Sequence, residues 1–123
     1  MTPVRRSLQA VSVAVLVMVG LVVGLAACSS QSAGPKPSDP TLAEGWQVYQ
    51  DHCATCHGGS GGGGSGPKLA GTVEHTYPDI AGQIAVIDNG KNGGMPAWKG
   101  TLSAAQIRAV ATYERKCLGR PSC

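Results

Sequence analysis

Cys53-Ala54-Thr55-Cys56-His57 is the stretch that decides how this chain folds. A Cys-x-x-Cys-His run is the attachment signature of c-type haem. Its two thiols form thioethers with the haem vinyl groups, and the adjacent histidine ligates the iron. We therefore predict that Cys53 and Cys56 hold one covalent haem c and that His57 is an axial iron ligand.

Two other kinds of site use paired cysteines, and both fit this sequence less well. A thioredoxin-like Cys-x-x-Cys motif needs a βαβ surround, and the sequence shows no such pattern. A structural zinc site needs four ligands at compact spacing. Here the next cysteine after Cys56 is Cys117, and His52 directly adjoins Cys53.

The second axial ligand is predicted to be Met95, because the other methionines lie in the apolar leader. Met95 belongs to the segment Gly-Gly-Met-Pro-Ala-Trp at residues 93–98. The two glycines allow the backbone to approach a flat cofactor, and Pro96 favours an extended conformation at Met95. The alternatives are that Met95 only fills the core, or that His75 is the distal ligand instead of an exposed loop residue.

The N-terminal segment predicts export. Arg5 and Arg6 precede an apolar run over residues 10–27, and Leu-Ala-Ala-Cys at residues 25–28 resembles the bacterial lipobox. We predict a lipoprotein signal peptide at residues 1–27 and lipidation of Cys28. An uncleaved membrane helix is the alternative, and either version attaches the domain to the outer face of a membrane.

Residues 28–40 are rich in Ser and Pro and predict a flexible linker, which leaves residues 41–123 as the domain. So small a domain usually needs a cofactor, metal or disulfide to complete its core. Without Arg5 and Arg6, eight basic residues face seven acidic ones, and no basic run indicates nucleic acid. The chain has no Phe, and its aromatic residues are Trp46, Tyr49, Tyr77, Trp98 and Tyr113.

Three or more helices and no strand are predicted, and three of them can be placed. The first begins at an Asp39 or Thr41 cap and ends near His52. The second covers residues 79–89 and stops at a glycine. A Ser-Ala-Ala-Gln capping box at residues 103–106 opens the third. Their apolar stripes are Leu42, Trp46 and Tyr49; Ile80, Ile84 and Ile87; and Ile107, Val110, Ala111 and Tyr113.

These motifs together resemble a class I mono-haem cytochrome c over residues 41 to about 117. The resemblance rests on the Cys-x-x-Cys-His run, on Gly-Pro-Lys-Leu-Ala-Gly at residues 66–71, on Gly-Met-Pro-Ala-Trp at residues 94–98 and on a final amphipathic helix. It implies a compact all-α fold around the haem, with His57 and Met95 as axial ligands. It also implies a hydrogen bond from the His57 ring to the Pro67 carbonyl, and a close crossing of the first and last helices. Gly45 or Tyr49 against Tyr113 would form that crossing.

Residues 58–66 depart from the family pattern, because Gly-Gly-Ser-Gly-Gly-Gly-Gly-Ser-Gly reads like an artificial flexible linker. We expect either an unusually mobile haem edge or an engineered insertion. Elsewhere, lipidation and haem attachment leave Cys117 and Cys123, which form a disulfide or remain two free thiols at the C-terminus.

The resemblance implies electron transfer instead of catalysis by this chain alone. The expected partners are membrane-bound redox complexes: a reductase donor and an oxidase or photosynthetic acceptor, met at the periplasmic face of the bacterial cytoplasmic membrane. Lys68, Lys91 and Lys99 either steer docking to an acidic partner or are simply solvated. The alternatives are a haem-based sensor with an open sixth site and a haem subunit of a larger oxidoreductase.

Overall fold

A computed structural model describes residues 32–121 and 123. The predicted signal peptide and Cys28 lie outside the described residues. The described part is helical, with two isolated β-bridges and no strand, which confirms the predicted all-α class. Its elements are α2 (Pro40–Val48), a π-helical turn η1 (Tyr49–Cys53), α3 (Ala54–His57), α4 (Val73–Thr76), α5 (Ile80–Asn89) and α6 (Ala104–Lys116).

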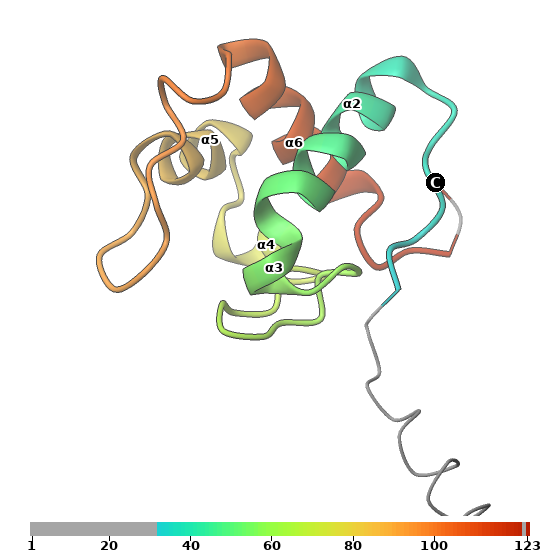
Figure 1. Cartoon of the computed structure of the whole chain (residues 1–123), viewed down its shortest axis with the longest axis horizontal. Helices are drawn as coiled ribbons and strands as arrows, with labels where there is room; N and C mark the ends of the chain where they lie inside the picture. The colour runs from blue at the N-terminus through green and yellow to red at the C-terminus, as the bar shows by residue number, and fades with distance from the viewer. Residues whose placement is uncertain (1–31, 122) are drawn as a thin grey trace, which may run out of the picture. The chain divides into compact units, whose positions relative to one another are not determined.

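The first three elements form one continuous column that carries the Cys-x-x-Cys-His run at its end (Figure 1). Asp39 caps the column, since its side chain accepts a hydrogen bond of 2.9 Å from the Leu42 amide. Pro40 occupies the first turn, where its missing N–H costs nothing. The widened turn over Tyr49–Cys53 was not predicted, and it takes the helix past the expected end at His52 to His57.

The other two long helices begin where the sequence predicts, and α5 also ends there. In α6 the Ser103 side chain accepts from the Gln106 amide, and the Gln106 side chain accepts from the Ser103 amide, so the capping box is complete. In α5 the Asp79 side chain caps the first turn, and Gly90 ends the helix with a φ of 70°.

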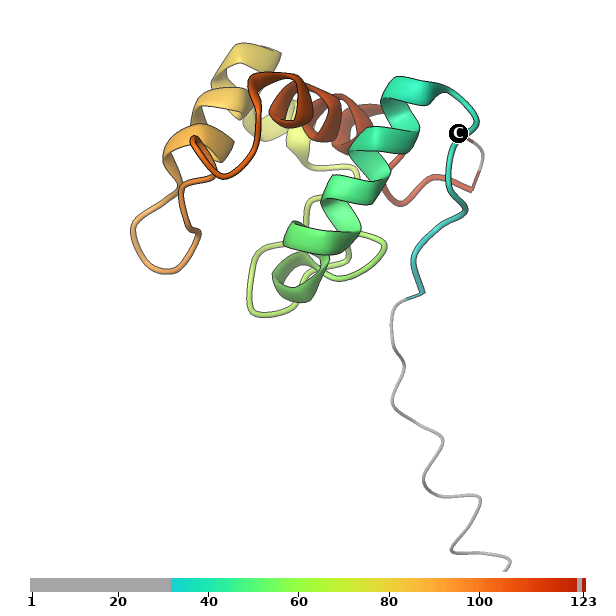
Figure 2. The same cartoon turned by 45° about the horizontal axis from the view of Figure 1, so that its top comes forward.

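α2 and α6 cross closely, as both views show (Figures 1 and 2). A side chain at Gly45 would overlap the Ala109 carbonyl oxygen and lie 2.7 Å from the Cβ of Tyr113. One turn further on, the Tyr49 and Tyr113 rings pack with centroids 5.7 Å apart. Both predicted contacts are therefore present. The core around them consists of Val48, Tyr49, Ile87, Leu102, Ile107, Val110, Ala111, Tyr113, Cys117 and Leu118.

Gly45→Ala is expected to lower the free energy of unfolding by about 1–3 kcal/mol, because the added methyl forces two helix backbones apart. The matched control is Gly82→Ala, in the exposed interior of α5, where a Cβ meets nothing closer than 4.0 Å. That control should raise stability by up to about 1 kcal/mol through helix propensity alone. Chemical denaturation of both variants measures the difference. Equal effects of the two substitutions would contradict a close crossing at Gly45.

The glycine-rich segment at residues 58–66 adopts a defined, hydrogen-bonded loop, although its composition reads like a flexible linker. The Gly61 carbonyl accepts from the amides of Leu69 and Ala70, and the Gly63 amide donates to the His57 carbonyl. Gly61 is buried and has a φ of 76°, which favours glycine. Glycine is thus required here by conformation, and the composition alone does not reveal the bonds that hold the loop.

The described part of the predicted linker lies against the domain. The Trp46 indole Nε1 donates a hydrogen bond of 3.0 Å to the Gly34 carbonyl, and the Lys36 ammonium lies 5.6 Å from the Trp46 ring centroid. Pro37 is buried. Residues 34–37 are therefore held on α2 before the helix begins at Pro40.

Candidate haem site

The Cys-x-x-Cys-His residues lie at the end of the helical column. Cys53 is half-buried, Cys56 is exposed, and both are free thiols. Burial, and to a smaller extent the negative charge of Glu114, raise the pKa of the Cys53 thiol to about 12. A reactive redox cysteine has a lowered pKa instead. Together with the absence of strands from residues 32–121 and 123, this argues against a thioredoxin-like site.

The His57 ring is buried and held in one orientation. Its Nδ1 lies 2.8 Å from the Pro67 carbonyl oxygen, which is the hydrogen bond that the resemblance implies. A carbonyl only accepts, so Nδ1 carries the proton and donates it. Among the described residues, no protein group forms a hydrogen bond with Nε2. That nitrogen therefore keeps its lone pair for a metal, and the Nδ1 bond fixes the tautomer and the orientation of the ring.

The glycine-rich loop packs directly on this histidine. A Cβ at Gly66 would lie 2.9 Å from two atoms of the His57 ring, and one at Gly64 would lie 2.8 Å from the Cys56 carbonyl oxygen. The Gly66 amide donates to the same Cys56 oxygen at 2.8 Å. The loop thus encloses one side of His57 at a distance that only glycine permits.

Met95 lies in a loop fastened to the end of α5. The Lys91 amide donates to the Met95 carbonyl at 3.0 Å, and the Trp98 amide donates to the Ile87 carbonyl at 3.1 Å. A Cβ at Gly90 would lie 2.5 Å from the Met95 carbonyl oxygen, so glycine is needed there too. The Met95 side chain is half-buried and packs against the core.

A contact between two aromatic rings connects the Met95 loop with the helical column. The His52 ring centroid lies 5.0 Å from that of Trp98. Because His52 precedes Cys53 directly and Trp98 follows Met95 by three residues, the two halves of the predicted site are neighbours. His75, the rival distal ligand, is exposed on α4.

The residues present fit a covalent haem. The two thiols are free, one histidine nitrogen is available, and glycines replace side chains wherever the loop backbone comes near His57. Several apolar side chains beside the core stay only partly buried and offer the surface that a large flat ring would cover: Leu69, Ile80, Ile84, Met95 and Trp98. In the described part of the chain, no three His, Cys, Asp or Glu side chains come together as a zinc site requires.

Comparison with known proteins decides the family. Residues 40–113 match the family model described as cytochrome C oxidase, cbb3-type, subunit III. The chain belongs to the cytochrome c family. Cytochromes c bind haem c covalently, so the predicted cofactor and fold are confirmed, and Cys53, Cys56 and His57 fit the attachment motif.

Individual relatives of this cytochrome c domain are of two sizes. The cbb3-type cytochrome c oxidase subunit FixP of Bradyrhizobium diazoefficiens is 35% identical over 87 residues, which are 68% of this chain but only 30% of FixP. Cytochrome c6 of Leptolyngbya boryana is 40% identical over 77 residues, which are 58% of this chain and 86% of that protein. Cytochrome cL of Hyphomicrobium denitrificans superimposes with a TM-score of 0.54 at 26% identity, covering 61% of this chain and 46% of its own.

One buried group of this cytochrome domain was missed in the sequence. Glu114 on α6 is 7% exposed and accepts a hydrogen bond from Gln83 on α5. The signal was available, because Glu114 follows Ile107 and Val110 at the spacing of the buried stripe.

Among residues 32–121, no helix combines the length and apolar character needed to span a membrane.

Proposed function

We propose that this chain carries single electrons between membrane-bound redox complexes, with His57 and Met95 as the axial ligands of its haem. When bound, haem c supplies an iron that alternates between the ferric and ferrous states. The observation that carries the proposal is the state of His57, which is buried, oriented through Nδ1 by Pro67 and free at Nε2. Membership of the cytochrome c family supports it.

Each residue of the site has a separate task in this proposal. Cys53 and Cys56 hold the ring covalently, and the column end fixes their spacing. His57 and Met95 would hold the iron from two sides and so would leave no position for a substrate. The folded glycine-rich loop covers His57 and limits the access of water.

The proposed location is the periplasmic face of the bacterial cytoplasmic membrane, through a lipid on Cys28. Support comes from the lipobox-like sequence at residues 25–28. A lipidated cysteine carries enough acyl chains for stable anchoring. The anchor keeps the carrier close to the membrane surface, where its membrane-bound partners lie. The similarity to the oxidase subunits FixP and CcoP makes a terminal oxidase a candidate electron acceptor.

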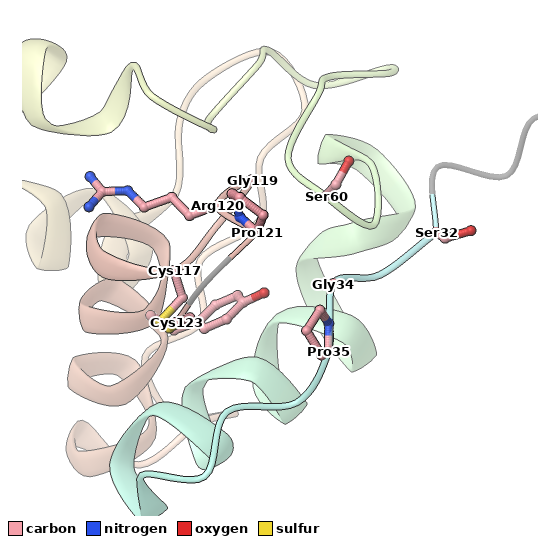
Figure 3. Close-up of a pocket in the computed structure, with 10 residues that line it drawn as sticks. Ser32, Gly34, Pro35, Ser60, Cys117, Gly119, Arg120, Pro121 and Cys123 are labelled. Carbon is pink, nitrogen blue, oxygen red and sulfur yellow. A yellow bond between two sulfur atoms is a disulfide. The ribbon is translucent and has the colours of Figure 1, made fainter.

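We include the Cys117–Cys123 disulfide in the proposal. Support comes from their Cα atoms, which lie 5.1 Å apart, and the bond would hold the C-terminal tail at a pocket that Pro35 also lines (Figure 3). Alkylation of the unreduced haem protein should label neither cysteine, and reduction should expose both. The double variant Cys117→Ser/Cys123→Ser should lose about 2 kcal/mol of stability. Two alkylated thiols before reduction would show that the disulfide is absent.

Exposed lysines are proposed to steer the encounter with an acidic partner. Lys68 and Lys99 are exposed, and the Lys91 ammonium lies 5.4 Å from the Tyr77 ring centroid. If they steer, the rate of electron transfer to a membrane oxidase falls as ionic strength rises. Replacing Lys68 and Lys99 by Gln should weaken this salt dependence, whereas Lys36→Gln, beside Trp46, should not. A rate that is independent of salt would rule out steering.

The function itself is tested by redox titration of the haem-loaded protein, followed by mixing with oxidase-containing membranes. We expect a reversible one-electron titration and rapid reoxidation by the membranes. The variant Cys53→Ala/Cys56→Ala should carry no haem after denaturation. A protein that titrates reversibly yet is never reoxidised by any membrane fraction would contradict the role of a carrier. A stoichiometric partner retained through purification would instead favour a subunit of a larger oxidoreductase.

A further inference from the structure

Glu114 is a buried carboxyl group that the electron-carrier proposal does not use. It is 7% exposed, and its Oε2 accepts a hydrogen bond of 2.7 Å from Nε2 of Gln83, which is itself 3% exposed. Arg115 reaches the other end of this amide, at 3.2 Å from Gln83 Oε1, but its guanidinium also binds the carbonyls of Tyr77 and Pro78. In the described part of the chain, no cation forms an ion pair with Glu114.

Glu114 shares the interior with the haem-attachment motif. Its negative charge contributes, after burial, to raising the pKa of both Cys53 and Tyr49. Cys53 is one of the two cysteines that would bind the haem covalently. The Tyr49 hydroxyl donates a hydrogen bond of 2.8 Å to the carbonyl of Gly58, the residue after His57. Tyr113, the residue before Glu114 on α6, packs against Tyr49 with ring centroids 5.7 Å apart, so α6 brings this carboxyl group to the column that ends in the haem-attachment motif.

The surroundings of Glu114 balance its two protonation states. Burial raises its pKa to about 7, and the Gln83 amide opposes the rise. Gln83 of α5 binds it directly, and its charge acts on the titratable groups of Tyr49 and Cys53 on η1 and of Tyr113 on α6, with Arg115 reached through Gln83. The charged residues of the other packed helices are exposed, namely Glu44 on α2 and Glu74 and His75 on α4.

We propose that Glu114 is a redox-linked proton site, so that this domain takes up one proton with each electron. This rests on the proposed electron-carrier function. On reduction, one electron enters from a one-electron donor, and a Glu114 carboxylate oxygen forms an O–H bond with a proton from solvent. On oxidation the electron leaves to the acceptor and the proton returns to solvent, so the net charge of the domain is the same in both states.

The coupling follows from electrostatics in a poorly solvated interior. An added electron makes the site more negative, and nearby carboxylate charge is screened much less there than in water. The reduced state therefore favours protonated Glu114, and the oxidised state favours the carboxylate. By linkage, the reduction potential must fall as pH rises through the range in which Glu114 titrates, near pH 7.

The test is the reduction potential of the full haem-loaded protein from pH 5.5 to 9, measured for the native protein, Glu114→Gln and Glu74→Gln. We expect the potential of the native protein to fall by about 59 mV for each tenfold difference in proton affinity between the two redox states. Glu114→Gln keeps the shape and the Gln83 contact but cannot ionise, so part of this fall should disappear. Glu74→Gln, an exposed control, should retain it. The carboxyl groups of the haem are common to all three proteins, so the difference isolates Glu114.

Two further readouts do not depend on electron-transfer activity. The redox-difference infrared spectrum should show the C=O stretch of a protonated carboxyl appearing on reduction, and Glu114→Gln should lack it. Gln83→Met removes the hydrogen bond that favours the carboxylate, so the fall in potential should move to higher pH. Identical pH profiles for native protein and Glu114→Gln, or a carboxyl band that survives in Glu114→Gln, would overturn the proposal. The visible spectrum taken in the same cell reports the axial ligands and tests the electron-carrier function separately.

Discussion

Met95→Ala is expected to convert a protein that does not react with carbon monoxide into one that binds it stoichiometrically. The native loop is fastened to α5 through the Lys91 amide and the Met95 carbonyl, and its Trp98 packs against His52. Loss of the Met95 side chain removes the sulfur ligand and leaves the backbone in place. One axial position of the iron is then open. The weak far-red band of methionine–iron ligation should vanish, and titration with carbon monoxide should follow one site per haem.

The matched variant Met95→His separates ligation from packing. An imidazole restores two filled axial positions, so the spectrum should return to low spin without the far-red band. The reduction potential should fall, because methionine raises it relative to a second histidine. If Met95→Ala leaves the spectrum and the response to carbon monoxide unchanged, Met95 is a core residue and His75 or another group is the ligand.

Glu114→Gln is expected to change the pH dependence of stability. The folded-state pKa of about 7 lies above the ordinary value of 4.5, so the native state binds more protons than the unfolded chain between these limits. The free energy of unfolding should therefore be highest below about pH 4.5 and fall by roughly 3 kcal/mol as pH rises to about 7. Glu114→Gln should lose this fall and be the more stable protein above pH 7.

Denaturant titrations of the oxidised haem protein at a series of pH values measure this effect. Glu74→Gln is the control, because Glu74 is exposed and forms only a long ion pair of 3.5 Å with Arg120. Its stability should follow the native curve at every pH. A Glu114→Gln curve that runs parallel to the native one would show that the buried carboxyl does not titrate between pH 4.5 and 7.

Local signals in the sequence predicted the elements that depend on neighbouring residues. Residues within one helical turn determine each helix end that was predicted, namely the Asp39 and Asp79 caps, the Ser103 capping box and the stop at Gly90. The buried stripe of α6 and the contact of Gly45 with Tyr113 followed from helical spacing and from the resemblance to a cytochrome c.

The features that were missed depend on contacts between distant residues. The loop at residues 58–66 is ordered by bonds to His57 and Leu69, which its composition does not encode. The short helix α4 has too few residues to show a period. Glu114 was not singled out, although its spacing from Ile107 and Val110 places it on the buried stripe, and its hydrogen bond with Gln83 depends on the packing of α5 against α6.

The most direct test of the central claim is the optical spectrum of the haem-loaded native protein, oxidised and reduced, with and without carbon monoxide. Ligation by His57 and Met95 predicts a six-coordinate low-spin spectrum with a weak far-red band that carbon monoxide does not change. A high-spin spectrum that shifts on addition of carbon monoxide would show an open iron, and a ligand-binding or sensor role would then replace electron transfer.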